Sequence, residues 1–346
     1  MWVSLALLSV PVLATPALDL QMTAPSQVDI NRLVIKTRLT NVGDESLMIL
    51  SEPTSILSLV PTNKFSFTAN TAAPSFTGIR LKYSPTKRKD AKSTYITLEP
   101  GQSVERVHSL AGVYDFSQSG PGWYKFTASR LFRHLNKSGS LERIRATSGS
   151  GQFRLSGALS ASRGVPVNRI KQVVSFNKCS PIQQNTIRLA AERADGYVDE
   201  ALAFLARRHR DGDQYSTWFG DYTKERRDDV VAGYEGIGHH ATRTTYDCEC
   251  HAAAGEAGVF TYVYPDTLGT IYVCDAFWDA PLFGLDSQAG AILQVNSQFV
   301  AYADASDTFF AQQECKDLAA ENPLGAARNG NNYEYFAETM ALHRLG

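Results

Sequence analysis

The chain has 346 residues, of which 43% are hydrophobic and 20% are charged, and its formal net charge is −1. This composition is that of a globular protein long enough for two domains, because one hydrophobic core usually covers about 100–200 residues. It has no uninterrupted run of about 18 apolar residues, so no membrane anchor is expected.

The first 17 residues predict a secretory signal peptide. Trp2 to Ala14 form an almost uncharged apolar run, and small residues suited to cleavage follow it. No Lys or Arg precedes the run, so the alternative is a buried first strand or helix of a cytosolic protein. We expect a secreted, extracellular protein.

Residues 18–160 predict a β-rich domain. Branched residues dominate 33–39, and residues 65–68 and 95–98 alternate apolar and polar side chains. Short strands at this spacing, without helical periodicity, indicate an antiparallel β-sandwich-like domain. Residues 161–174 contain Gly, Pro and scattered Arg and Lys, and they predict a linker and candidate processing region.

Residues 175–346 predict a mainly helical domain with a small hairpin, so the fold class is α+β. Ser180-Pro181 is a cap followed by a first-turn proline, and it opens an amphipathic segment that reaches about Arg208. The remaining expected elements are a helix between 221 and 234, a hairpin over 260–274, a helix from 286 to about 302, and helices after 306 and 331.

The two halves carry opposite charge. Residues 1–174 have 21 Lys and Arg against 10 Asp and Glu, whereas residues 175–346 have 13 against 25. This contrast predicts that the N-terminal half docks on the acidic C-terminal half; the alternative is that each charge only keeps its half soluble. Residues 87–92 are the only dense basic run, which argues against a nucleic-acid partner.

All five cysteines lie in the C-terminal half, at Cys179, Cys248, Cys250, Cys274 and Cys315. In an oxidising compartment four of them can form two disulfides, with three pairings open and one thiol left over. A zinc ribbon is disfavoured because one residue separates Cys248 from Cys250, where such sites usually have a two-residue spacer.

The order of short motifs in the second half resembles the deuterolysin and peptidyl-lysine metalloendopeptidase family, the aspzincins. The matching stretches are Ser-Thr-Trp-Phe-Gly at 216–220, Tyr-Asp-Cys-Glu-Cys at 246–250, Tyr-Val-Tyr-Pro at 262–265, and the segments 269–278, 284–290 and 332–336. The similarity covers about residues 175–340, and segments 40–47 and 74–78 resemble the family's N-terminal propeptide. The resemblance implies a zincin-like helical domain behind a propeptide-like domain.

The resemblance also implies how the cysteines pair. The family pattern joins Cys179 to Cys248 and Cys250 to Cys274. Cys315 has no family partner, and we expect a buried, inert thiol on a helix.

Members of the family hold zinc with His-Glu-x-x-His on a helix and a later Asp, because two His four residues apart share one helix face while the Glu acts on the bound water. In this chain Gln294 and Gln298 stand at the two His positions, and Val295 stands at the Glu position. The third ligand position keeps Asp307, and the oxyanion Tyr position aligns with Phe310. Amides are weak zinc ligands and valine accepts no proton, so we expect no bound zinc and no intact catalytic group.

The lysine-pocket positions of the family are half retained. Glu334 matches the pocket Glu, while the partnering Asp aligns with Asn331. The resemblance therefore implies a weakened cleft for a cationic side chain; the alternative is that Glu334 is an ordinary polar residue near a helix start. His239, His240 and His251 could rebuild a metal site only if adjacent imidazoles reached one ion, which is rare.

These observations predict a catalytically inactive family member that binds a peptide or protein through the inherited cleft. The alternative is an active zinc metalloendopeptidase with an atypical site, cleaving at lysine bonds as the family does. A third hypothesis is a regulator of an active relative.

Overall fold

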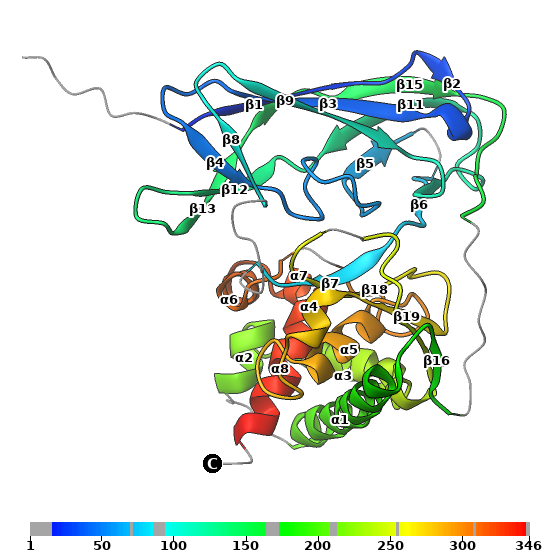
Figure 1. The fold of residues 1–346 in the computed structure, drawn as a ribbon, viewed down its shortest axis with the longest axis vertical. Coiled ribbons are helices and arrows are strands. Elements are labelled where there is room, and N and C mark those ends of the chain that lie inside the picture. The colour runs from blue at the N-terminus through cyan, green and yellow to red at the C-terminus, as the bar shows by residue number, and fades with distance from the viewer. Residues whose placement is uncertain are drawn as a thin grey trace, which may run out of the picture.

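A computed structural model describes residues 16–69, 72–85, 94–163, 173–207, 213–253, 256–306 and 309–343. The fold is mixed α+β, with several sheets and eight α-helices among the described residues. Figure 1 shows a strand-rich N-terminal part stacked on a helical C-terminal part. The predicted signal peptide lies almost entirely outside the described residues.

The described residues of the N-terminal part form three four-stranded sheets and one two-stranded sheet around their own hydrophobic core. The first sheet has the order β14 (Thr147–Ser148), β1 (Leu18–Thr23), β3 (Val34–Asn41), β9 (Ser103–Ser109). The second is β2 (Gln27–Val28), β15 (Gly151–Leu155), β11 (Gly122–Ala128), β5 (Phe65–Thr68), and the third is β13 (Leu141–Arg145), β12 (Leu131–Leu135), β4 (Leu47–Leu50), β8 (Tyr95–Leu98). The small sheet pairs β10 (Tyr114–Asp115) with β6 (Ser75–Phe76).

This part is not purely antiparallel. Strand β1 pairs with β14 in parallel, and β15 pairs with β2 in parallel. Both parallel partners are two-residue strands at the outer edge of their sheet, where the chain can run in either direction without disturbing the central pairs. The long central strands, such as β3 against β9, pair antiparallel as the alternating pattern predicts.

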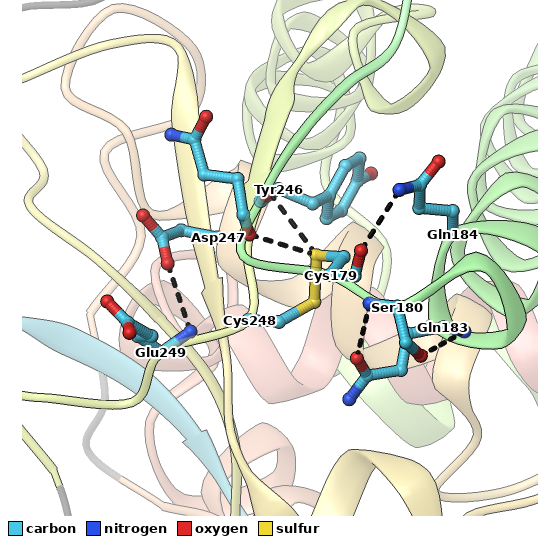
Figure 2. The surroundings of a disulfide bond; sticks show 9 residues. Cys179, Ser180, Gln183, Gln184, Tyr246, Asp247, Cys248 and Glu249 are labelled. Carbon is cyan, nitrogen blue, oxygen red and sulfur yellow. Dashed lines mark hydrogen bonds between the residues drawn. A yellow bond between two sulfur atoms is a disulfide. The ribbon is translucent and has the colours of Figure 1, made fainter.

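The C-terminal part is built around the long helix α1 (Pro181–Ala206), which begins at a capping box: Ser180 Oγ accepts from Gln183 N, and Gln183 Oε1 accepts from Ser180 N. Figure 2 shows this cap beside the Cys179–Cys248 disulfide, where Gln184 Nε2 donates to Cys179 O. The disulfide therefore fixes the start of α1 to the strand that ends at Asp247. The other helices are α2 (Asp213–Phe219), α3 (Lys224–Ile237), α4 (Asp275–Trp278), α5 (Gln288–Ser297), α6 (Gln312–Glu321), α7 (Pro323–Ala326) and α8 (Gly330–His343).

The predicted hairpin is formed by β18 (Val259–Val263) and β19 (Thr270–Val273), which pair antiparallel. It belongs to a larger, five-stranded sheet with the order β16 (Ser175–Asn177), β17 (Thr245–Asp247), β19, β18, β7 (Arg80–Tyr83). The outermost strand, β7, comes from the N-terminal part and lies along β18 in Figure 1. The sequence did not predict that β7 joins this sheet, because a four-residue strand carries no signal for a partner about 180 residues away.

A separate apolar cluster fills the junction of the two parts. It joins Leu81 and Tyr83 of β7 to residues of β18 and to Phe310, and all of them are buried. Its remaining members are Val60, Ile79, Ala253, Val259, Tyr262 and Cys274. The two parts thus share one core in addition to their own.

Helix α5 ends earlier than predicted. It stops at Ser297 rather than near Tyr302, and the Arg80 guanidinium of β7 donates to the carbonyl oxygen of Gln298 at 2.8 Å. That carbonyl follows the last turn of the helix, where no further backbone N–H group of the helix is available to donate to it. Among the described residues, no helix is both long and apolar enough to cross a membrane.

Candidate functional site: a buried lysine in an acidic pocket

The side chain of Lys82 from β7 is fully buried inside the C-terminal part. Its Nζ lies 2.6 Å from Glu334 Oε2, 3.0 Å from Asp286 Oδ1 and 3.3 Å from Asn331 Oδ1. A buried ammonium is costly unless it is paired and hydrogen-bonded, and here three oxygens surround it. The three oxygens therefore form a lysine pocket.

Two helices position the pocket. Glu334 and Asn331 project from the first two turns of α8, and Asp286 directly precedes Ser287, the N-cap of α5. Glu338, one turn beyond Glu334, accepts from the backbone N–H groups of Asp286 and Ser287 at 3.1 and 3.0 Å. The α8 carboxylates thus also hold the segment that carries Asp286.

The two helices approach each other closely because Gly290 has no side chain. A Cβ atom at this position would lie 2.0 Å from Glu338 Oε1 and 3.1 Å from Glu334 Cγ. A side chain at 290 would displace the Glu338 carboxylate, which accepts from Ser287 N, so glycine at this position preserves that contact.

Aromatic rings complete the surroundings of the ammonium. Lys82 Nζ lies 4.9 Å from the ring centre of Tyr335 and 5.8 Å from that of Phe260, within the range of cation–π attraction. The hydroxyl of Tyr335 donates to Phe310 O at 2.8 Å and lies 3.0 Å from Asp286 Oδ1. Charge, hydrogen bonds and rings all select a long cationic side chain.

The pKa values reflect burial and charge together. Burial disfavours the charged form of Lys82, but Glu334, Asp286 and Glu338 outweigh it and raise the pKa of Lys82 above its ordinary value. Burial also raises the pKa of Glu338 to about 7, with Lys82 opposing the rise. For Glu334, burial raises the pKa, which favours the neutral acid, whereas the 2.6 Å contact with Lys82 favours the carboxylate. The contact prevails, and Lys82 and Glu334 form an ion pair.

Gln294 and Gln298, which the resemblance aligns with the two histidine positions, face the peptide group that precedes Lys82. Gln294 Nε2 and Gln298 Nε2 each donate to Leu81 O at 3.4 Å, and both glutamines are fully buried. The first lies on α5 and the second caps its C-terminal end. The backbone carbonyl of Leu81 therefore occupies the space in front of these two positions.

These residues do not fit a zinc ion. The amide nitrogens that face the site are hydrogen-bond donors, which repel a cation, and a peptide carbonyl already takes their hydrogens. Val295 is buried and has no proton acceptor. Phe310 is buried with its ring edge-to-face on Tyr83, at 5.3 Å between centroids. Asp307 lies outside the described residues.

The alternative histidines are not assembled into a site. His239 Nε2 lies 2.8 Å from Asp199 and His251 Nε2 lies 2.9 Å from Glu249, both at exposed positions. His240 stacks on Tyr302 at 4.4 Å between ring centroids. In the part of the chain that the structure describes, no group of three His, Cys, Asp or Glu side chains could hold a metal ion.

The cysteines take the pairing that the resemblance implied. Disulfides join Cys179 to Cys248 and Cys250 to Cys274. Cys315 is a buried free thiol on α6, and burial raises its pKa well above the ordinary value. A thiol held protonated and out of solvent is a poor nucleophile.

Sequence reasoning singled out Asn331 and Glu334, and the structure brings both to one ammonium group. It missed Asp286, which supplies the second carboxylate of the pocket. The resemblance places an Asp at position 331, where this chain has Asn331. Sequence reasoning also missed the ligand itself. The sequence offered no signal for it, because Arg80 and Lys82 alternate with Leu81 and Tyr83, a pattern that predicts an exposed charged face rather than a buried lysine.

Comparisons with known proteins show what this chain is similar to. Residues 204–338 match the family model "Lysine-specific metallo-endopeptidase". The chain is 35% identical over 342 residues to a peptidyl-Lys metalloendopeptidase of Grifola frondosa, covering 97% of both chains. It is 26% identical over 346 residues to an extracellular protease of Aeromonas hydrophila, covering 96% of both. A solved zinc peptidase from Grifola frondosa matches 46% of this chain and 97% of its own, with 38% identity and a TM-score of 0.44.

The fold and the site thus define an α+β protein with a lysine pocket between two helices and a sheet. The chain belongs to the lysine-specific metallo-endopeptidase family, the aspzincins.

Proposed function

We propose that this chain is a secreted, catalytically inactive member of its family that recognises a lysine-bearing strand without cutting it. In this proposal residues 18–160 are a propeptide-like domain and residues 175–346 a zincin-like domain. The lysine pocket keeps its recognition role, and the neighbouring helix has lost the groups that would activate water.

The main support for catalytic inactivity is the contact of Gln294 and Gln298 with Leu81 O. Both amides donate at 3.4 Å, where a hydrolytic site would need a Lewis acid to polarise the same type of carbonyl. A neutral amide supplies far less charge stabilisation, and Val295 supplies no base. Losing metal and base together removes most of the rate of a metal hydrolase.

Secretion is supported by three features. The apolar run at the N-terminus suits a signal peptide, and two disulfides need an oxidising compartment to persist. The Aeromonas hydrophila relative is named an extracellular protease.

The alternative is an active zinc metalloendopeptidase with an atypical site that cleaves at lysine bonds. It is favoured by the 35% identity to a peptidyl-Lys metalloendopeptidase over almost the whole chain. It requires a metal held by ligands other than Gln294 and Gln298.

Metal analysis and a proteolysis assay on the purified full chain separate the two. We expect less than about 0.1 zinc per chain after dialysis against zinc-containing buffer, and no cleavage of denatured casein above a buffer blank. One zinc per chain together with hydrolysis that a chelator abolishes would establish the alternative.

A further inference from the structure

Strand β7 is held by the C-terminal part in the manner of an extended peptide ligand. It adds antiparallel to the edge of β18, with Arg80 opposite Val263, Leu81 opposite Tyr262 and Lys82 opposite Thr261. Strand addition fixes the register of a bound chain through its backbone, while pockets select alternate side chains. Here the selected side chain is Lys82.

The peptide group between Leu81 and Lys82 lies between the two glutamines and the lysine pocket. On its carbonyl side, Leu81 O accepts from Gln294 and Gln298; on its amide side, Lys82 enters the pocket of Glu334 and Asp286. We propose that β7 is a substrate mimic bound in cis: the Leu81–Lys82 bond occupies the place of a lysyl bond to be cut, and two glutamine amides hold its carbonyl. This inference rests on the proposed function, because it assigns the strand that the inactive cleft recognises.

The residues on either side are anchored as well. The Arg80 guanidinium donates to Gln298 O at 2.8 Å and Ala305 O at 2.9 Å, and it pairs with Asp304 at 2.8 Å. On the other side, the buried ring of Tyr83 packs on Phe310. Four consecutive residues therefore contact the C-terminal part, as expected for a peptide lying along a cleft.

Ordinary packing between two domains would not need a buried lysine. An apolar residue at 82 would fill the same space without the desolvation cost of an ammonium and its carboxylates, which amounts to several kcal/mol per ion. Other ion pairs between the two parts range from nearly buried, as for Arg133 with Glu314, to partly exposed, as for Arg163 with Asp266, whereas Lys82 and Glu334 are both completely buried. The fully buried ion pair between β7 and α8 is therefore best explained as recognition of a lysine.

The first test asks whether Lys82 holds the two parts together. A protease site introduced between residues 164 and 172 is cut in the folded full chain, and dissociation of the halves is followed by size-exclusion chromatography. We expect the wild-type halves to stay together and Lys82→Met to weaken their association at least about 10-fold. Lys125→Met, at an exposed position on β11, is the matched control and should match the wild type. Association of Lys82→Met within twofold of wild type would overturn the inference.

A competition experiment on the clipped wild type covers the case in which Lys82→Met does not fold. A peptide with the sequence of residues 77–84 should speed separation of the halves, and its analogue with norleucine in place of lysine should not. Equal effects of the two peptides would overturn the inference.

The second test restores the family residues. In the variant Gln294→His/Val295→Glu/Gln298→His/Phe310→Tyr with added zinc, water should add to the Leu81 carbonyl carbon. The Leu81–Lys82 C–N bond then breaks, and a proton goes to the new amino group. Mass spectrometry should find a fragment beginning at Lys82, and adding Lys82→Met should abolish it. A restored enzyme that cuts an added lysyl peptide but leaves this bond intact would overturn the mimicry.

These outcomes separate the inference from the function on which it rests. Zinc-dependent hydrolysis by the wild type would refute catalytic inactivity, whatever the halves do. Dissociation that does not depend on Lys82 would refute the mimicry alone and leave an inactive family member in place.

Discussion

Lys82 Nζ and Glu334 Oε2 lie 2.6 Å apart, and both side chains are completely removed from solvent although they come from opposite parts of the chain. The pair therefore couples the docking of β7 to the charge of α8. Removing one partner of such a pair leaves the other charge buried, which is far more damaging than losing a surface pair.

Glu334→Gln should lower the free energy of unfolding by about 3 kcal/mol, because Lys82 keeps only Asp286 as a close anionic partner. Urea denaturation at pH 7 measures the loss. Glu45→Gln, which breaks the pair with the largely exposed Lys137, should cost less than about 1 kcal/mol. Equal effects of the two substitutions would contradict the assignment of a buried ion pair.

Gly290→Ala should destabilise the protein and loosen the pocket, because the new methyl group would lie 2.0 Å from Glu338 Oε1. The matched control is Gly196→Ala in α1, where the nearest atom to a new Cβ is Arg193 Nη1 at 3.4 Å. That control should gain up to about 1 kcal/mol from the better helix propensity of alanine. Thermal unfolding midpoints that move in the same direction for both variants would show that α5 and α8 are not so closely packed.

The buried Lys64 predicts a pH dependence of stability. Burial lowers its pKa to about 7, so the folded state releases a proton that the unfolded state keeps up to about pH 10.5. Between these values the unfolded state binds more protons, and stability should rise with pH. Lys64→Met should flatten the rise in denaturation curves recorded from pH 7 to 10, whereas Lys125→Met should leave it unchanged. A slope that persists in Lys64→Met would assign the effect to other groups.

The two disulfides should differ in their contribution to stability. The Cys179–Cys248 bond closes a separation of 69 residues and the Cys250–Cys274 bond one of 24. In the chain-entropy model these loops are worth about 4.4 and about 3.5 kcal/mol. Replacing Cys179 and Cys248 by serine should therefore cost about 1 kcal/mol more than replacing Cys250 and Cys274, measured by urea denaturation. The opposite order would mean that native-state contacts of the shorter bridge dominate.

The sequence predicted the elements that local signals define. The cap at Ser180-Pro181 marked the start of α1, and the apolar runs around 260 and 271 marked the hairpin, because capping and strand periodicity are properties of neighbouring residues. The family motifs likewise pointed to Asn331 and Glu334. Their common ligand was not predictable from such signals.

The parts that sequence reasoning missed depend on contacts across long separations. Nothing in four residues of β7 indicates that β18 is their partner, since any exposed strand edge accepts a strand. Helix α5 ends at Ser297, and the carbonyl of Gln298 that follows accepts from Arg80 of the other part of the chain, a contact that local signals do not reveal. The role of Asp286 became visible only once Lys82 was placed beside it.

The pairing of β7 with β18 also governs what happens to a shortened chain. A product that starts at residue 175 would present the bare flank of β18, a row of open backbone donors and acceptors beside a vacated acidic pocket. Such an unpaired edge can pair with the same edge of another molecule. The C-terminal portion made by itself should therefore self-associate, and the associated fraction should rise with its concentration. In the full chain β7 covers this edge, so the N-terminal portion should keep the C-terminal portion monomeric.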